Sequence, residues 1–174
     1  MCTEGGIIKK TKLEAYSRPR VNGINAITIR ENDRLLDVKL TNGDNHIIIA
    51  KRSGKAINFH ESNVRPMGRT ASGVRGVRLE NDSDRAIGMV CITREDSDLL
   101  VVSKNGYGKR SSYLDYRVTN RGGKGIIGII NSPRNGNISA SLVVGEEDEI
   151  ILSTDKGSIM RCAVKEIRTA GRNT

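Results

Sequence analysis

The chain has 174 residues with no Trp and a single Phe, so any core that it buries must be aliphatic. No apolar run approaches the 18 or so residues of a membrane-spanning helix, and no signal peptide is visible. The net charge of +9 at pH 7 favours an anionic partner.

Cysteine and histidine usage argues against a disulfide framework or a metal site. Cys2, Cys91 and Cys162 are odd in number and far apart, which suits small buried side chains in a reducing cytoplasm. His46 and His60 lie near no cysteine at ligand spacing, so we expect no metal to be bound.

A glycine turn recurs along the whole chain, in GGIIKKT, SGKAINF, NGYGKRS and KGSIMRC. The turn glycines are Gly6, Gly54, Gly106 and Gly157, separated by 48, 52 and 51 residues. A period of this length predicts a modular β architecture of repeated units within a single domain. The units span roughly 1–46, 47–98, 99–149 and 150–174.

Each unit predicts four strands, a to d, because its apolar runs are short, rich in Ile and Val, and bounded by turn residues. Strand b follows the first glycine, and strand c follows a second glycine at Gly23, Gly73 or Gly125. Strand a is expected at 47–51, 99–103 and 150–154, and strand d at 35–40, 86–92 and 138–144.

The first unit lacks most of strand a, and the last lacks c and d. The run Ile47–Ile49 is apolar on both faces, as expected of a strand between two neighbouring sheets. Helix is expected for one turn at most, in 12–18 and 164–169.

Positive charge is concentrated between strands b and c of every unit. Segments 9–20, 55–78, 104–124 and 156–172 carry +4, +4, +5 and +4, whereas acidic residues gather in the d-to-a turns. Stacked in register, such units predict a continuous positive belt and a separate negative rim. A polyanion along the belt is the natural partner, although a surface with scattered Lys and Arg is the simpler alternative.

The belt supplies the candidate binding residues. Few aromatics and no base-reading helix accompany the Lys and Arg, which favours backbone contact and DNA bending over sequence readout. Some Arg could instead bind carbonyl groups of loops or neighbouring units. The candidates are Lys9, Lys10, Arg18, Arg20, Arg65, Arg69, Lys109, Arg110, Arg117, Arg121, Lys124, Arg161, Arg168 and Arg172.

The ordered series GGIIKKT, SGKAINFHESNVRPMGRTASGVRGVRL, NGYGKRSSYLDY and VKEIRTAGRNT resembles successive blades of the C-terminal domain of the bacterial DNA gyrase A protein. The resemblance implies an all-β, propeller-like β-pinwheel. Its four-stranded antiparallel blades exchange a hairpin strand between neighbours. This chain would form about three and a half blades of an incomplete ring.

The same resemblance implies a function. Duplex DNA would wrap around the basic outer edge and so help gyrase to introduce negative supercoils. The rest of the gyrase A protein, together with the gyrase B protein, would be the partners in an A2B2 holoenzyme. ATP and Mg²⁺ would be bound elsewhere in the holoenzyme, with no cofactor in this chain. The location would be the bacterial cytoplasm, at the nucleoid and not at a membrane.

The loop Asn120-Arg121-Gly122-Gly123-Lys124-Gly125 is similar to the family's box motif, QRRGGKG. Glycines let a backbone approach phosphates, while Arg and Lys neutralise charge. Thr119 and Asn120 depart from the motif, and the loop lies in the third unit, not the first. It is either a working box or a turn before strand c.

Catalysis is not expected in this chain. Gyrase cleaves DNA through a Tyr preceded by Arg, and no tyrosine here has that neighbour. No Walker loop and no catalytic triad is present. Two alternatives to the gyrase domain stay open, namely the C-terminal domain of topoisomerase IV and a propeller that serves as a protein-interaction scaffold.

Overall fold

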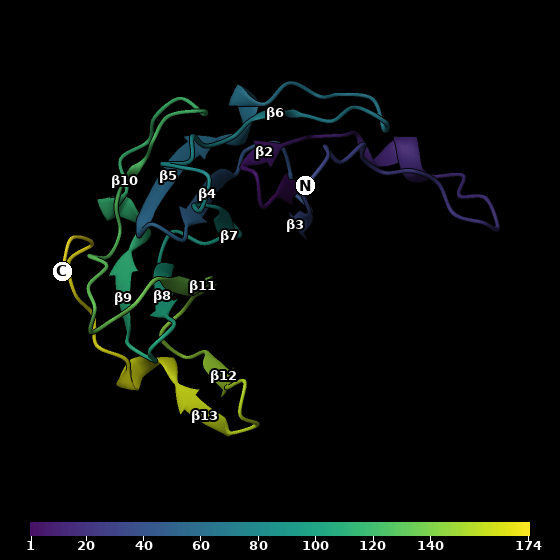
Figure 1. Cartoon of the computed structure of the whole chain (residues 1–174). Helices are drawn as coiled ribbons and strands as arrows, with labels where there is room; N and C mark the ends of the chain where they lie inside the picture. Colours follow the sequence, from purple (N-terminus) through teal and green to yellow (C-terminus); the bar gives the residue numbers. More distant parts are fainter.

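The computed structural model describes residues 1–174 and consists of short strands, with four single-turn 3-10 helices (Figure 1). None of its helices is long and apolar enough to cross a membrane. The units follow one another along an open arc, and no closed ring forms (Figure 1). The fold is therefore an all-β, propeller-like pinwheel, as predicted.

The elements recur in the predicted order. The first unit contains β1 (Cys2–Thr3), β2 (Ile7–Ile8), η1 (Leu13–Tyr16) and β3 (Leu35–Asp37). The second contains β4 (His46–Lys51), β5 (Lys55–His60), η2 (Glu61–Asn63), β6 (Val74–Arg75) and β7 (Ala86–Ile92). The third contains β8 (Asp98–Ser103), β9 (Gly108–Ser112), η3 (Tyr113–Asp115), β10 (Ile126–Ile127) and β11 (Ile138–Val144). The fourth contains β12 (Glu149–Ser153), β13 (Ile159–Ala163) and η4 (Val164–Glu166).

Strand c of the second unit and strand c of the third unit are each exchanged with the unit before. One of the two four-stranded sheets has the order β10-β5-β4-β7, so that β10 of the third unit forms the edge of the second unit's sheet. In the same way, β6 pairs with β2 of the first unit. All ladder pairings are antiparallel, which confirms the predicted blade and the exchange of strands.

The c strands are short, and the one predicted in the first unit does not form. β6 and β10 have two residues each, and the first unit has no strand after Gly23. The exchanged contact is short because the chain leaves the neighbouring ladder at once through Gly76 and Gly128, whose amides donate to the carbonyls of Gly6 and Gly54 at 2.8 Å. The exchanged strand therefore pairs with the neighbouring unit over two residues only.

The glycine before each c strand is required by close approach. Gly125 has φ +76°, and a Cβ built on it would lie 2.4 Å from the carbonyl oxygen of Ala56. Gly73 repeats this arrangement in the preceding unit, where a Cβ would lie 2.6 Å from the carbonyl oxygen of Ile8. A side chain at either position would push the exchanged strand away from its partner.

The apolar core lies between units. In β4, Ile47 and Ile49 pack into a cluster shared with the first unit, whereas Ile48 packs into a cluster shared with the third. The strand is thus buried on both faces, as its sequence predicts. A smaller cluster around Leu100, Ile150 and Val164 joins the third and fourth units.

The remaining local predictions agree with the structure. Single helical turns occur at η1 and η4, within the two stretches expected to form them. The other two turns, η2 and η3, were not predicted. All three cysteines are free; Cys2 is buried, and Cys91 and Cys162 are partly buried.

Candidate nucleic-acid interface

An arginine directly follows the C-cap residue of each of the last three 3-10 helices, η2, η3 and η4. Arg65, Arg117 and Arg168, here called the arginine row, are all exposed and form no salt bridge. Each directly precedes a residue in an isolated parallel bridge to the preceding unit, namely Lys10–Pro66, Asn58–Val118 and Arg110–Thr169. The bridges hold the three arginines at equivalent places in successive units.

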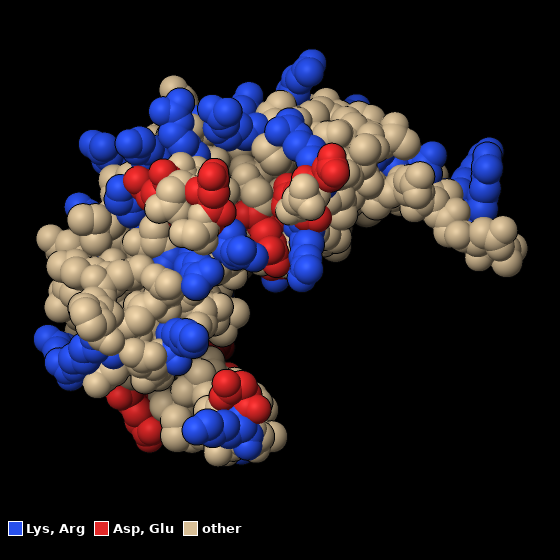
Figure 2. Space-filling model, in the orientation of Figure 1, with Lys and Arg blue, Asp and Glu red and all other residues tan.

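Lys and Arg side chains gather along one edge of the arc. On the face shown in Figure 2, Lys and Arg follow much of the convex edge of the arc. The loops that lead into β6 and β10 lie along that edge (Figure 1). Over the upper part of the arc, Asp and Glu form small groups away from it (Figure 2). The upper convex edge is therefore positive on this face, whereas the inner side and the lower part of the arc carry Lys and Arg beside Asp and Glu (Figure 2).

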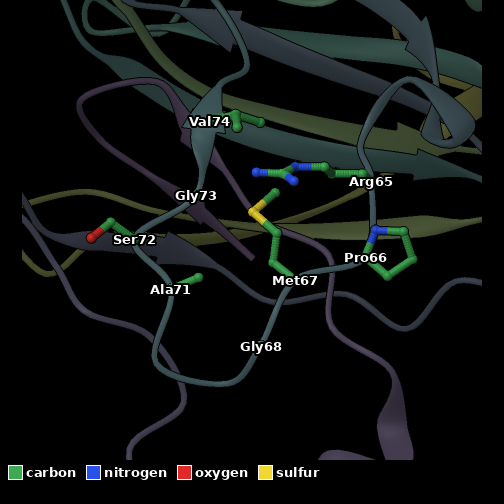
Figure 3. A pocket seen from close by; sticks show the side chains of 8 residues that line it. All are labelled: Arg65, Pro66, Met67, Gly68, Ala71, Ser72, Gly73 and Val74. Atoms are coloured by element: carbon green, nitrogen blue, oxygen red, sulfur yellow. The ribbon is translucent and has the colours of Figure 1, made fainter.

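The surface is hollowed beside the row in two successive units. In the second unit, a hollow of about 390 Å³ lies between the arms of the loop 65–74, with the Arg65 side chain beside Met67 (Figure 3). The equivalent loop of the third unit lines a hollow of about 280 Å³ that includes Arg117, Asn120 and Lys124. The mixed lining and exposed cations suit a solvated anion better than an apolar ligand.

Two of the candidate lysines are buried. Lys9 donates to the carbonyl oxygens of Ala26 and Arg69, and Lys109 donates to those of Gly171 and Arg172. Only 2% of Lys9 and 6% of Lys109 are exposed. Burial lowers the pKa of Lys109 to about 8. Lys109 thus joins β9 to the last loop of the fourth unit, and Lys9 joins a loop of its own unit to the loop of the second unit. Both arrangements favour an internal role.

The following position repeats this arrangement. Lys10 donates to the carbonyl of Glu61 at 2.9 Å, and Arg110 donates through Nε to that of Ile167 at 3.0 Å. Asn58 occupies the equivalent place in the second unit and donates to Tyr116 at 2.8 Å. The bond to the next unit is therefore kept even where the sequence replaces the cation by an amide.

The box-like loop, Asn120 to Gly125, is held against the second unit. Arg121 is partly buried and donates to the carbonyls of Asn63 and Arg75 at 2.8 and 3.0 Å. Lys124 is exposed and has no acidic partner. Arg172, the equivalent of Arg121, donates to the carbonyl of Ile127 at 2.9 Å.

The other candidates are dispersed. Arg18 and Arg20 are exposed on the loop that extends from the arc, and Arg69 is partly buried. Arg161 is exposed and pairs with Glu149 across the β12–β13 hairpin. The structure thus places Arg65, Arg117 and Arg168 at equivalent, exposed positions, and Lys124 is exposed as well. Internal partners are given to Lys9, Lys10, Lys109, Arg110, Arg121 and Arg172.

Two exposed arginines were overlooked. Arg75 and Arg78 follow the second glycine of the second unit, in the segment VRGVR, and neither side chain forms a salt bridge. Their membership of the basic segment 55–78 was the available signal. They extend the exposed positive charge past β6.

A β-pinwheel in which an exposed arginine recurs at the same place in three successive units defines a repeat domain with a basic outer edge. The family described as DNA gyrase C-terminal domain, beta-propeller, matches residues 1–42, 46–93, 97–142 and 148–174. The chain belongs to this family.

Relatives agree with this assignment. The chain is similar to the DNA gyrase A protein of Salmonella typhimurium, with 40% identity over 174 residues. It is similar to the same protein of Staphylococcus epidermidis, with 41% identity over 171 residues. The matches cover 100% and 98% of this chain but only 20% and 19% of those relatives, so the chain spans about a fifth of their length.

Two solved structures share the fold. The C-terminal domain of DNA topoisomerase IV superimposes with a TM-score of 0.93 and 29% identity, covering 99% of this chain and 54% of that one. A DNA gyrase A C-terminal domain superimposes with a TM-score of 0.87 and 24% identity, covering 98% of this chain and 57% of that one.

Proposed function

We propose that the chain binds duplex DNA without sequence preference and bends it along the convex edge of the arc. The observation that carries this proposal is the arginine row, because one free cation at the same place in successive units matches a regular phosphate backbone. Lys124 and the hollows beside Arg65 and Arg117 add further positions for phosphate oxygens.

The wider role follows from the family. The relatives, which are DNA gyrase A proteins, favour a share in ATP-dependent negative supercoiling. The partners would be the remainder of the gyrase A protein together with the gyrase B protein. ATP and Mg²⁺ would be bound outside this chain, and DNA cleavage would be performed elsewhere. The protein would work in the cytoplasm, where the DNA is.

A salt titration tests binding. Each phosphate neutralised on B-DNA contributes about −0.9 to the slope of log K against log salt concentration. If the row and Lys124 contact four phosphates, we expect a slope of roughly −3 to −4. Binding that is insensitive to salt, or no binding at low salt, contradicts the proposal and favours a protein-interaction scaffold.

A topology assay separates the gyrase role from the topoisomerase IV role. The TM-score of 0.93 to the topoisomerase IV domain keeps that second role in view. Nicked plasmid is ligated with the chain bound, and the linking number is read after the protein is removed. A change in linking number supports wrapping as in gyrase, and binding without such a change supports the alternative.

A further inference from the structure

We propose that Arg121 and Arg172 are positioning residues that fix the orientation of the third and fourth units, each relative to the unit before it. Through that orientation they set the curvature of bound DNA, and the phosphate contacts are left to exposed neighbours. The inference rests on the proposed DNA-bending function, and it assigns the arginine of the box-like loop a role inside the protein.

The contacts of Arg121 lie within the protein. Its Nε and one Nη donate to carbonyls at two separate places in the second unit, Asn63 at the end of η2 and Arg75 in β6. A planar guanidinium suits two such acceptors because its donors are held in a fixed fork. Arg121 therefore joins three segments from two units.

The contact recurs one period later. Arg172 stands 51 residues after Arg121 and donates to Ile127, which occupies in β10 the place that Arg75 occupies in β6. Contact with phosphate does not require an arginine to bind a backbone carbonyl, so it does not explain why the same carbonyl is bound at both junctions. The recurrence therefore marks a feature of the junction between units.

The backbone around Arg121 supports the same reading. The amide of Gly122 donates to the carbonyl of Gly76 at 2.6 Å, and the amide of Arg78 donates to the carbonyl of Gly123 at 2.8 Å. The box-like loop is thus bound edge to edge against the second unit. Arg121 completes this junction, whereas Lys124 in the same loop stays exposed.

This division of roles has a physical consequence for DNA. Duplex DNA resists bending, and the free-energy cost of a bend rises with the bend angle. A protein imposes a bend only if the angle between its adjacent units stays fixed against the stiffness of the DNA. Loss of a junction bond should therefore relax the bend while the number of phosphate contacts stays the same.

The test compares two matched arginines four residues apart, in the full chain. Arg121→Gln removes the fork, and Arg117→Gln removes an exposed cation. Affinity for duplex DNA is measured over a salt series, and bending is measured by energy transfer between dyes at the two ends of a short duplex. Arg172→Gln serves as a second junction variant.

We expect Arg117→Gln to reduce the magnitude of the salt slope by about 1. Arg121→Gln and Arg172→Gln should leave the slope at its wild-type value and reduce the energy transfer. Arg121→Lys keeps the charge but loses the fork, so it should bend DNA as poorly as Arg121→Gln. Thermal unfolding of each variant confirms that the comparison is made on folded protein.

Two outcomes overturn the inference. One is a salt slope that falls by about 1 in Arg121→Gln and is restored in Arg121→Lys, since Arg121 would then contact phosphate directly. The other is unchanged energy transfer in both junction variants, because the junctions would then not govern curvature. If wild-type protein fails to bind or bend DNA, the proposed function fails first.

Discussion

The substitution Gly125→Ala should disrupt the pairing of the exchanged strand β10 with β5, which joins the third unit to the second. Gly106→Ala provides a matched control. Both glycines lie in the third unit with similar backbone angles, φ +76° and +82°. No atom lies within 4 Å of a Cβ at Gly106, whereas a Cβ at Gly125 meets the carbonyl oxygen of Ala56 at 2.4 Å. The pair separates backbone strain from steric displacement.

The expected magnitudes follow from this geometry. Positive φ costs a non-glycine residue about 1–2 kcal/mol, partly offset by reduced freedom in the unfolded chain, so Gly106→Ala should lose about 1 kcal/mol. At Gly125, the strand must also move by about 1 Å to reach ordinary contact, which costs about 1–3 kcal/mol for overpacking and about 1 kcal/mol for a weakened hydrogen bond. Gly125→Ala should therefore lose about 3–5 kcal/mol.

Thermal and denaturant unfolding measure both losses. For a chain of this size, 1 kcal/mol shifts the midpoint by about 2–4 °C, so Gly106→Ala should lower Tm by roughly that amount. Gly125→Ala should lower it by roughly 6–20 °C. Equal shifts in the two variants would refute the argument, because the exchanged strand would then not depend on close approach at Gly125.

Four further results are expected. Burial lowers the pKa of Lys109 to about 8 from 10.5, so the unfolded chain binds more protons between those values. The free energy of unfolding should rise with pH over that interval, and Lys109→Met should flatten the rise; an identical profile in the variant would contradict this. Lys51 is fully buried and lies 2.8 Å from Glu80 and 3.7 Å from Asp84, so Lys51→Met should cost about 3–5 kcal/mol in denaturant unfolding. Hydrogen bonds from Lys51 and then Lys55 hold the pKa of Glu80 at about 2, so wild-type stability should be lost as pH falls from 4.5 towards 2, and less steeply in Lys51→Met. Burial raises the pKa of Cys2 to about 12, so this thiol should resist a thiol reagent until the protein unfolds, and rapid labelling of the native protein would be the opposite result.

Periodicity allowed most of the fold to be predicted. The alternation that sends Ile47 and Ile48 into different clusters is visible as a run that is apolar on both faces. The short c strands could not be predicted, because two-residue pairing leaves no hydrophobic period to detect. Their length depends on backbone contacts with another unit, at Gly6 and Gly54.

The candidate site was harder to predict, because the charge of a residue does not reveal whether its side chain points into the protein or towards solvent. Lys109 and Arg117 stand eight residues apart in the same basic segment, yet one is buried against carbonyls and the other is exposed. Asn58 was the available signal in the sequence. An amide at a position otherwise held by Lys10 and Arg110 indicates a role met by any hydrogen-bond donor, not by charge.

The exchange of strands also affects the order in which the chain can fold during synthesis. Ala56 in β5 pairs with Ile126 in β10, which the ribosome makes 70 residues later. At about 5–20 residues per second, the outer edge of β5 waits roughly 4–14 s for its partner. Through that interval, each newly made unit exposes an unpaired strand edge, the kind of surface on which nascent chains associate.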